Sequence, residues 1–336
     1  ITGMPTPPNA GCRGGGRGRR RMMLFAEQIL NGLQYGVMLF LTAAGLTLVF
    51  GIMGLINLAH GSLYMVGAFA AAFVGVWRGS FVLALLAGLG AAAATGAVMQ
   101  GVVLRHLYRR SHLDQVLATF GLIMVSNEAI ALLFGRQPLQ APMPAALSGS
   151  LRLGGVPYPA YRVLIIAVGL AAAGFLAWLI GRTRTGMRVR AGAADREIAG
   201  ALGVRIGWLD GQVFILGALL AGLAGALAGP LLSVEIGMGE RVLITTFVVI
   251  VIGGIGSVRG AMAGALLVGL ADTLARAYLP DVLRLVMAGP DADALGGGLA
   301  SMAVFLLMAL VLLVRPRGLT LGQFIRNSAG LQYSDE

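Results

Sequence analysis

RTRTGMRVRAGAADREIAGALGVR, residues 182–205, carries six arginines and lies between two apolar runs, 161–181 and 209–232. Each apolar run is long enough for a helix that crosses the hydrocarbon core of a bilayer, which takes about 20 residues. Charged side chains are costly inside a membrane, so the arginines mark a solvent-exposed loop. The alternation of apolar run, charged loop and apolar run therefore predicts a membrane protein with helical spans.

The centre of this loop, AADREIAGALG (193–203), has the pattern of a short amphipathic helix. Ala194, Ile198 and Leu202 recur at i, i+4 spacing, so they would line one side of that helix. A chain built from lipid-facing helices has little use for an ordered helix in a solvent loop unless that helix binds something. We therefore expect the loop to dock onto a soluble partner protein.

The composition extends this interpretation to the whole chain. The protein is 57% hydrophobic and 12% charged, whereas a soluble domain has about 25% charged residues. The short alternation typical of a transmembrane β-barrel is absent. We expect an all-α polytopic transmembrane bundle of about nine spans, within the range of eight to ten, at residues 24–50, 56–77, 80–104, 114–135, 161–181, 209–232, 242–258, 260–279 and 299–314.

The arginines also predict the orientation of the bundle. When the spans are threaded in order, thirteen loop arginines fall on the side of the 182–205 loop and seven on the other side. Arginine-rich loops remain in the cytoplasm. We expect the 182–205 loop and the C-terminal tail, 319–336, to be cytoplasmic.

The N-terminal segment conflicts with this orientation. Nine spans with a cytoplasmic C-terminus place the N-terminus outside, yet residues 13–21, RGGGRGRRR, hold five arginines. Met22 and Met23 directly precede the first apolar run, so we expect residues 1–21 to be an extension that the native protein lacks. The transmembrane domain would then be 22–318. The alternative is a genuine basic tail together with one miscounted span.

A second region of interest is GIMGLINLAHGSLYMVGAF, residues 51–69. Its glycines weaken the helix, and Asn57 and His60 place polar groups at membrane depth. Broken helix at that depth is tolerated where it is buried in protein or lines a wet cavity. Asn57, His60 and Gly61 are therefore candidates for a translocation path. The alternative is that Asn57 and His60 cap a helix or bond to a neighbouring helix.

Several function classes find no support in the sequence. All 25 basic residues are arginine, so a lysine-containing phosphate-binding loop is excluded and any ATP must bind to another subunit. The segment 253–264, GGIGSVRGAMAG, follows an apolar helix, and we interpret it as a tight turn with Arg259 at its tip. The three histidines do not cluster as metal ligands. We expect no enzyme activity, no cofactor and no nucleic-acid partner.

Three segments together resemble the branched-chain amino acid permeases of bacterial ABC importers, and specifically their first-type subunit. They are GLTLVFGIMGLINLAHGSLYMVGAF (45–69), GMRVRAGAADREIAGALGV (186–204) and VIGGIGSVRGAMAGALLVGLAD (251–272). The resemblance covers about residues 22–318, nearly all of the hydrophobic chain. It implies a multi-pass protein of the bacterial inner membrane.

The resemblance also implies partners. A second, related permease subunit would complete the channel, two cytoplasmic ABC ATPases would bind ATP, and a periplasmic binding protein would deliver substrate. The 182–207 loop is similar to the coupling loop of such importers, with Glu197, Ala199 and Gly203 at its acidic, small and glycine positions. The general pattern of that loop is only loosely kept here. The candidate coupling residues are Asp195, Arg196, Glu197, Ile198, Ala199, Leu202 and Gly203.

The family resemblance leaves the substrate open. Branched-chain amino acids are the first expectation, because a zwitterion with an apolar tail suits a pore with few charges. Similar permeases import urea, short-chain amides or aromatic acids. A different class, an ion-coupled secondary transporter, would act alone and would need buried carboxylates. Glu128 and Asp272 are the acids that lie well inside apolar runs.

Overall fold

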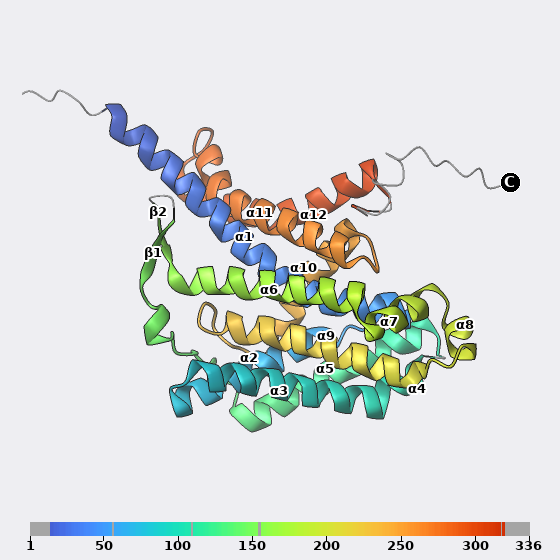
Figure 1. The fold of residues 1–336 in the computed structure, drawn as a ribbon. Helices are drawn as coiled ribbons and strands as arrows, with labels where there is room; N and C mark the ends of the chain where they lie inside the picture. The colour runs from blue at the N-terminus through green and yellow to red at the C-terminus, as the bar shows by residue number, and fades with distance from the viewer. Residues whose placement is uncertain (1–13, 56, 109, 154–155, 317, 320–336) are drawn as a thin grey trace, which may run out of the picture.

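The computed structural model describes residues 14–319 except 56, 109, 154–155 and 317. Most of this part is helical, and the long helices run side by side in alternating directions (Figure 1). Eight helical segments of the described residues are long and apolar enough to cross a membrane. They lie in α1 (Gly14–Met53), α2 (His60–Arg78), α3 (Phe81–Met99) with its extension to Leu107, α5 (His112–Phe134), α6 (Ala160–Arg182), α9 (Ile206–Ala228), α11 (Val258–Leu283) and α12 (Gly289–Val314).

A further helix, α10 (Met238–Gly253), has 16 residues. At 1.5 Å per residue it is about 24 Å long, shorter than the roughly 30 Å hydrocarbon core. The α3 extension consists of a π-helical turn, η1 (Gln100–Leu104), and α4 (Arg105–Leu107). These helices match the nine predicted apolar runs, so the prediction of an all-α membrane bundle is confirmed.

The short elements define the two ends of the bundle. A 3-10 turn, η2 (Ala145–Leu147), precedes an antiparallel hairpin of β1 (Ser150–Leu153) and β2 (Val156–Pro159). At the other end of α6 lie α7 (Arg184–Ala194) and α8 (Arg196–Ala201). We call these the hairpin end and the α8 end; they lie at opposite sides of Figure 1.

The prediction of a single helix over 193–203 is wrong. Asp195 interrupts it: its backbone N–H donates to Ala191 O at 3.0 Å and closes α7. Its side chain then accepts from the N–H of Ile198 at 2.9 Å and caps the start of α8. An aspartate at the N-cap satisfies an unpaired donor of the first turn. The i, i+4 pattern therefore crosses a helix boundary.

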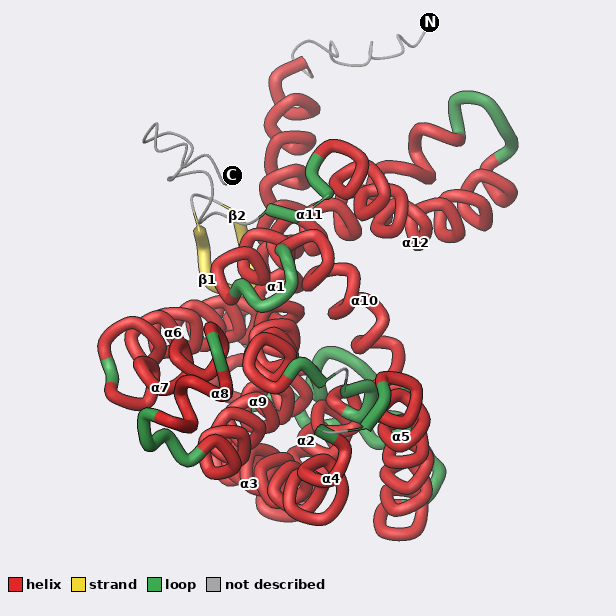
Figure 2. The backbone as a smooth tube through the Cα atoms, turned by 90° about the vertical axis from the view of Figure 1, so that its right-hand side faces the viewer, coloured by secondary structure: helices red, strands yellow, loops and turns green. Residues whose placement is uncertain are grey.

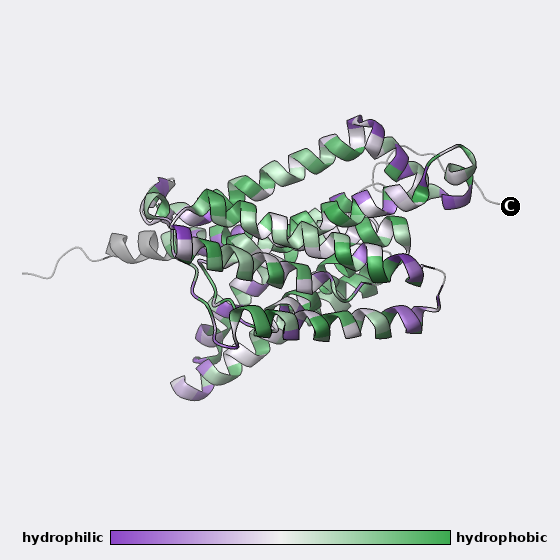
Figure 3. Ribbon diagram, turned by 90° about the horizontal axis from the view of Figure 1, so that it is seen from below, coloured by the Kyte–Doolittle hydropathy of each residue, from purple (hydrophilic) through white to green (hydrophobic). Residues whose placement is uncertain are grey.

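α1 is the central helix of the bundle. It packs against α11, α9, α6 and α10, and Figure 2 shows it between α6 on one side and α11 on the other. The outer helices expose apolar side chains instead, for example Leu132 on α5 and Leu313 on α12. Hydrophobic residues make up most of the length of the helices, whereas hydrophilic residues are more frequent near helix ends and loops (Figure 3). This distribution is the one expected of a protein surrounded by lipid.

Small residues allow the inner helices to approach closely. A Cβ on Gly67 of α2 would lie 2.5 Å from the Cα of Gly222 on α9, and a Cβ on Gly225 would overlap the backbone of Tyr64. Without a hydrophobic driving force between helices in lipid, such backbone proximity supplies much of the packing energy. Gly67, Gly222 and Gly225 therefore serve the packing of α2 against α9.

Candidate functional site

The chain turns back into the bundle between α1 and α2. Gly54 ends α1 with φ +63°, and its N–H donates to Phe50 O at 2.9 Å. A Cβ on Gly45 would lie 3.0 Å from His60 Nε2. Gly45 precedes the end of α1 by about 12 Å of helical rise. α2 therefore starts inside the bundle, below the level at which α1 ends.

The returning segment carries polar groups into the protein interior. Asn57 and His60 are each 0% exposed. Asn57 Oδ1 accepts from the N–H of Ala59 at 3.0 Å, so one half of this amide organises the turn before α2. Asn57 Nδ2 and both ring nitrogens of His60 have no hydrogen-bond partner among the described residues. Unpaired buried polar atoms are costly, and they are the groups that a passing substrate or water could satisfy.

Gly61 has a structural role of its own. A Cβ on Gly61 would overlap the carbonyl of Gly239, and a Cβ on Gly239 would overlap the carbonyl of Gly61. The first turns of α2 and α10 thus touch backbone to backbone. Neither this contact nor the burial of Asn57 and His60 establishes a translocation path, so that role remains a prediction.

A cavity of 550 Å³ opens toward the hairpin end. α1, α2, the first turn of α6, α10 and the segment 231–235 after α9 form its walls, and we call it the hairpin-end cavity. Tyr64 of α2 lines it. His60 lies one helical turn deeper on the same face of α2, at i−4. The cavity therefore points toward the buried imidazole.

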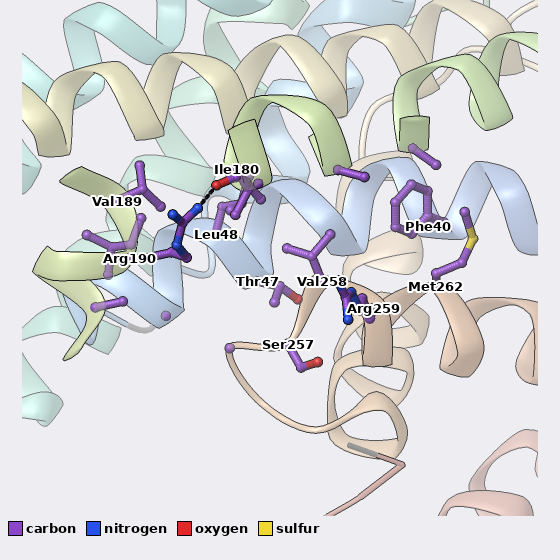
Figure 4. A pocket seen from close by; sticks show the side chains of 17 residues that line it. Phe40, Thr47, Leu48, Ile180, Val189, Arg190, Ser257, Val258, Arg259 and Met262 are labelled. Atoms are coloured by element: carbon purple, nitrogen blue, oxygen red, sulfur yellow. Dashed lines mark hydrogen bonds between the residues drawn. The ribbon is translucent and has the colours of Figure 1, made fainter. Parts of the chain in front are cut away.

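A second cavity, of 820 Å³, lies toward the α8 end (Figure 4). α1, α6, α7 and the start of α11 surround this α8-end cavity. Arg190 and Arg259 line it, and Arg190 donates to the carbonyl of Ile180. The turn before α11 is formed by Gly254–Ser257, so Arg259 lies in the first turn of α11 rather than at the tip as predicted. On α1, Leu39 lines the hairpin-end cavity and Phe40 lines the α8-end cavity. The next four residues, Leu41, Thr42, Ala43 and Ala44, are each 0% exposed.

Arg196 bonds the start of α8 to the bundle. Its Nη1 donates to the carbonyl of Ile52 at 2.7 Å, and its Nη2 donates to Asp210 Oδ2 at 2.7 Å. The guanidinium also lies 5.8 Å from the ring centroid of Tyr108. Three elements therefore meet at Arg196: the last turn of α1, the N-terminal part of α9 and the residue after α4.

The contact with Ile52 matters because of where that carbonyl lies. Carbonyls in the last turn of a helix lack an intrahelical partner, and Ile52 is the residue before the end of α1. Arg196 supplies that partner. It thus ties α8 directly to the point where α1 ends and the polar segment with Asn57 begins.

Tyr108 completes the anchor from the other side. Its hydroxyl donates its one hydrogen to Gln100 Oε1 at 2.7 Å, and the sulfur of Met53 lies 3.6 Å from the same oxygen. Burial raises the pKa of Tyr108 to about 12, and the bond to Gln100 offsets only part of that shift. The hydroxyl therefore stays protonated and remains a donor at physiological pH.

The rest of α8 faces solvent. Ile198 is 60% exposed and Leu202 is 80% exposed, whereas Ala199 is buried against the bundle. Asp195, Glu197 and Gly203 are exposed as well, and Gly203 ends the segment with φ +89°. The predicted apolar side is thus present at the surface, although Ala194 belongs to α7. Exposed apolar residues next to charged ones are typical of a protein-docking surface.

The partners of Arg196 could not be predicted from the sequence. Asp210 is 1% exposed, yet in the sequence it is one acid at the edge of an apolar run. Ile52 contributes only a backbone oxygen, which has no sequence signal. Proximity between α8 and the end of α1 depends on the whole bundle, so only the structure reveals it.

Comparison with known proteins matches this chain to branched-chain amino acid transport permeases. Residues 28–315 match the family model described as the permease component of the branched-chain amino acid transport system. The chain is 31% identical to the high-affinity branched-chain amino acid transport system permease protein BraD of Pseudomonas aeruginosa over 312 residues, which cover 88% of this chain and 95% of BraD. It is 28% identical to the corresponding protein LivH of Escherichia coli K12, with 89% of this chain and 96% of LivH covered.

More distant similarities extend the comparison. A probable branched-chain amino acid transport permease protein, LivH of Methanocaldococcus jannaschii, is 24% identical over 88% of this chain and 92% of its own. Among solved structures, PsaBC from Streptococcus pneumoniae in complex with Fab aligns with 82% of this chain and 90% of its own at 13% identity, with a TM-score of 0.41, too low to add to the argument. On the match of residues 28–315, the chain belongs to the family of branched-chain amino acid transport system permease components.

Proposed function

We propose that this chain is the membrane-spanning permease subunit of an ABC importer that brings leucine, isoleucine and valine across the inner membrane of a bacterium. The observation that carries the proposal is the α8 element. Its exposed tip, Ile198 and Leu202, is available to a cytoplasmic protein. Its first residue, Arg196, donates a hydrogen bond to the carbonyl of Ile52 at the end of α1. A movement of a cytoplasmic protein bound to α8 would therefore be transmitted to α1, the central helix.

We propose the partner subunits that the family resemblance implies. Two ATPase subunits would bind ATP, and one of them would receive α8 in a groove at the α8 end. A periplasmic binding protein would release substrate at the hairpin end, and a second, related permease would pack beside this chain. The family membership and the nearly full coverage of BraD and LivH support this assembly.

The mechanism that we propose uses the two cavities in turn. Movement of the ATPases shifts α8, and Arg196 transmits the shift to the last turn of α1. The segment with Asn57 and His60 follows α1 directly, and His60 approaches α1 at Gly45. Such coupling requires that the ATPases contact α8 differently in the two states. The buried, unpaired groups of Asn57 and His60 would meet the substrate during its passage.

An ion-coupled secondary transporter fits the structure less well. Glu128 is paired with Arg136 at 2.8 Å, and both side chains are more than half exposed. Asp272 is paired with Arg276 at 2.9 Å. A proton relay needs carboxylates that can change their charge inside the membrane, and these two acids sit on different helices with separate arginine partners.

The substrate is tested by uptake in cells that lack their own branched-chain amino acid transport. Cells would express this chain together with the neighbouring genes for the ATPases, the second permease and the binding protein. We expect uptake of radiolabelled leucine that unlabelled isoleucine and valine suppress and that urea leaves unchanged. Uptake of urea or an amide without uptake of leucine would support the proposal of an importer and contradict the proposed substrate.

A further inference from the structure

We infer that the hairpin-end cavity is an acceptor site for a zwitterionic α-amino acid within this chain, where the ligand rests after entering the transporter and before it passes His60. The identity of the ligand rests on the proposed function, whereas the chemistry of the site rests on the cavity itself. Its volume of 550 Å³ lies within the range of about 300–1,000 Å³ that is typical of small-molecule sites.

The charges in the cavity match a zwitterion. Arg241 and Glu235 form an ion pair across its mouth, with side chains 62% and 39% exposed. Arg162 lines the same cavity and donates to Asn31 Oδ1, a neutral acceptor. No carboxylate pairs with Arg162 among the described residues. The site therefore holds two guanidinium groups and one carboxylate, which leaves one positive charge unbalanced.

A ligand with both charges restores the balance. Its carboxylate would accept from the guanidinium groups of Arg162 and Arg241, and its ammonium group would donate to Glu235. Charge-assisted bonds of this kind are stronger than neutral ones, and arginine suits a carboxylate because it can donate twice. An uncharged ligand such as urea would leave the surplus positive charge in place. The cavity therefore favours an amino acid over urea or an amide.

The deeper wall of the cavity is apolar, with one buried amide side chain, Gln34. Met38, Leu39, Met238 and Val242 would surround an aliphatic side chain. Gln34 is 6% exposed, and its amide nitrogen donates to the sulfur of Met38 at 2.9 Å. A thioether is a weak acceptor, so this amide can exchange it for a ligand oxygen. The wall thus accepts a small apolar tail while the charged groups stay at the mouth.

The test is a labelling experiment on the complete transporter in lipid nanodiscs. In a Cys12→Ser background, Thr245→Cys places a thiol in the cavity wall, and Ser233→Cys provides a second reporter nearer the mouth. Ser148→Cys, in the loop before β1, is the control outside the cavity. The rate of reaction with a small methanethiosulfonate reagent is measured with leucine, with leucinol, which lacks the carboxylate, with 4-methylpentanoate, which lacks the ammonium group, and with urea.

We expect leucine to slow labelling of both cavity thiols and not of Ser148→Cys, while the other three compounds protect weakly or not at all. Arg241→Gln should weaken protection by leucine about tenfold, the loss of one charge-assisted hydrogen bond. The matched control is Arg284→Gln. Arg284 is also an arginine in an exposed ion-pair cluster, with Asp281 and Asp293, and it lies outside the cavity. It should leave protection unchanged.

Uptake measured on the same preparation separates the two proposals. Leucine uptake without protection of either thiol would overturn the inference of an acceptor site but would agree with the proposed importer function. Protection by leucine without leucine uptake would keep the site and overturn the proposed function. Equal effects of Arg241→Gln and Arg284→Gln on protection would also overturn the site.

Discussion

At the scale of single residues, the decisive contact is the one between Arg196 and Asp210. The Asp210 side chain is 2% exposed and the Arg196 side chain 33%, so the pair is largely removed from water. Charges in such a pair are expensive to bury, but removing one partner is worse because it leaves the other unpaired. Arg196 can therefore not be exchanged without a cost to the fold and to the link with α1.

We expect Arg196→Ala to destabilise the protein by about 3 kcal/mol, the lower end of the range for a broken buried ion pair. Thermal unfolding of the purified chain in detergent would measure this. The matched control is Arg188→Ala, an exposed arginine of the adjacent α7, which should change stability by about 0.5 kcal/mol or less. The double variant Arg196→Met with Asp210→Leu should recover stability, because no buried charge remains. Equal unfolding temperatures for Arg196→Ala and Arg188→Ala would contradict the anchoring role.

A second prediction at this scale concerns His60. Both ring nitrogens are buried without a partner, so His60→Leu should leave stability unchanged or increase it by about 1 kcal/mol. Uptake should nevertheless fall about tenfold if the imidazole contacts the substrate, which corresponds to one lost hydrogen bond. Thermal unfolding and uptake are measured on the same preparation. Full uptake by His60→Leu would remove this residue from the proposed path.

The sequence predicted part of this residue-scale picture. Asn57 and His60 stood out because polar groups are rare in an apolar segment, and the structure places both in the interior. Arg196 was predicted as a candidate coupling residue because of the loop in which it lies, and its bonding partners were not predicted. Its function depends on a buried acid fourteen residues later and on a backbone oxygen in α1, and neither has a periodic signal.

At the scale of elements, α8 separates anchoring from docking. Ala199 and Arg196 face the bundle, whereas Glu197 and Ile198 face solvent. Changes on the solvent side should therefore leave the fold intact. This division makes the docking role testable without unfolding the protein.

We expect the double variant Glu197→Arg with Ile198→Ser to insert and unfold like the wild type but to lose co-purification of the ATPases. Affinity capture through a tag on this chain, followed by quantification of the bound ATPases, measures the effect. Arg188→Glu is a charge reversal on exposed α7 and serves as the control; it should retain the ATPases. Normal ATPase binding by the double variant would refute the docking role of α8.

The contact between α2 and α10 supports a further prediction. A Cβ on Gly61 would overlap the carbonyl of Gly239, and neither backbone can shift without moving its helix. Gly61→Ala should therefore destabilise the protein by about 1–3 kcal/mol, the usual cost of overpacking a core. Gly90→Ala on α3 is the control, because a Cβ there meets no atom within 4 Å. Equal yields and unfolding temperatures for the two variants would show that the helices do not touch at Gly61.

The elements were largely predictable because lipid imposes a simple rule. Each run of apolar residues long enough to cross the bilayer became a helix, as hydrogen-bond satisfaction in hydrocarbon requires. The 182–205 loop lies outside the apolar runs, so this rule does not apply to it. There the i, i+4 pattern of Ala194, Ile198 and Leu202 led to the wrong prediction of a single helix. The capping preference of Asp195 was visible in the sequence and would have placed the boundary between α7 and α8.

At the scale of the whole molecule, the central position of α1 explains how distant sites are related. One part of this helix lines the hairpin-end cavity, another part lines the α8-end cavity, and its last turn bonds to α8. A single helix therefore touches every site in the proposed transport cycle. The sequence could not show this, because nothing in an apolar run distinguishes a central helix from a lipid-facing one.

Orientation and the chain ends belong to this scale as well. The expectation that 182–205 faces the cytoplasm rests on the arginine distribution. The predicted extension, 1–21, falls mainly on residues 1–13, outside the described residues, and α1 includes Gly14 onward. Most of the predicted tail, 319–336, is also outside them, although the N–H of Leu319 donates to Ile252 O at 2.7 Å.

The most direct test is leucine uptake into proteoliposomes with this chain alone and with the complete set of second permease, ATPases and binding protein. We predict uptake only with the complete set, only with ATP, and no uptake driven by a proton or sodium gradient. Leucine uptake by this chain alone under an ion gradient would contradict the central claim, and Glu128 and Asp272 would then be the residues to change first.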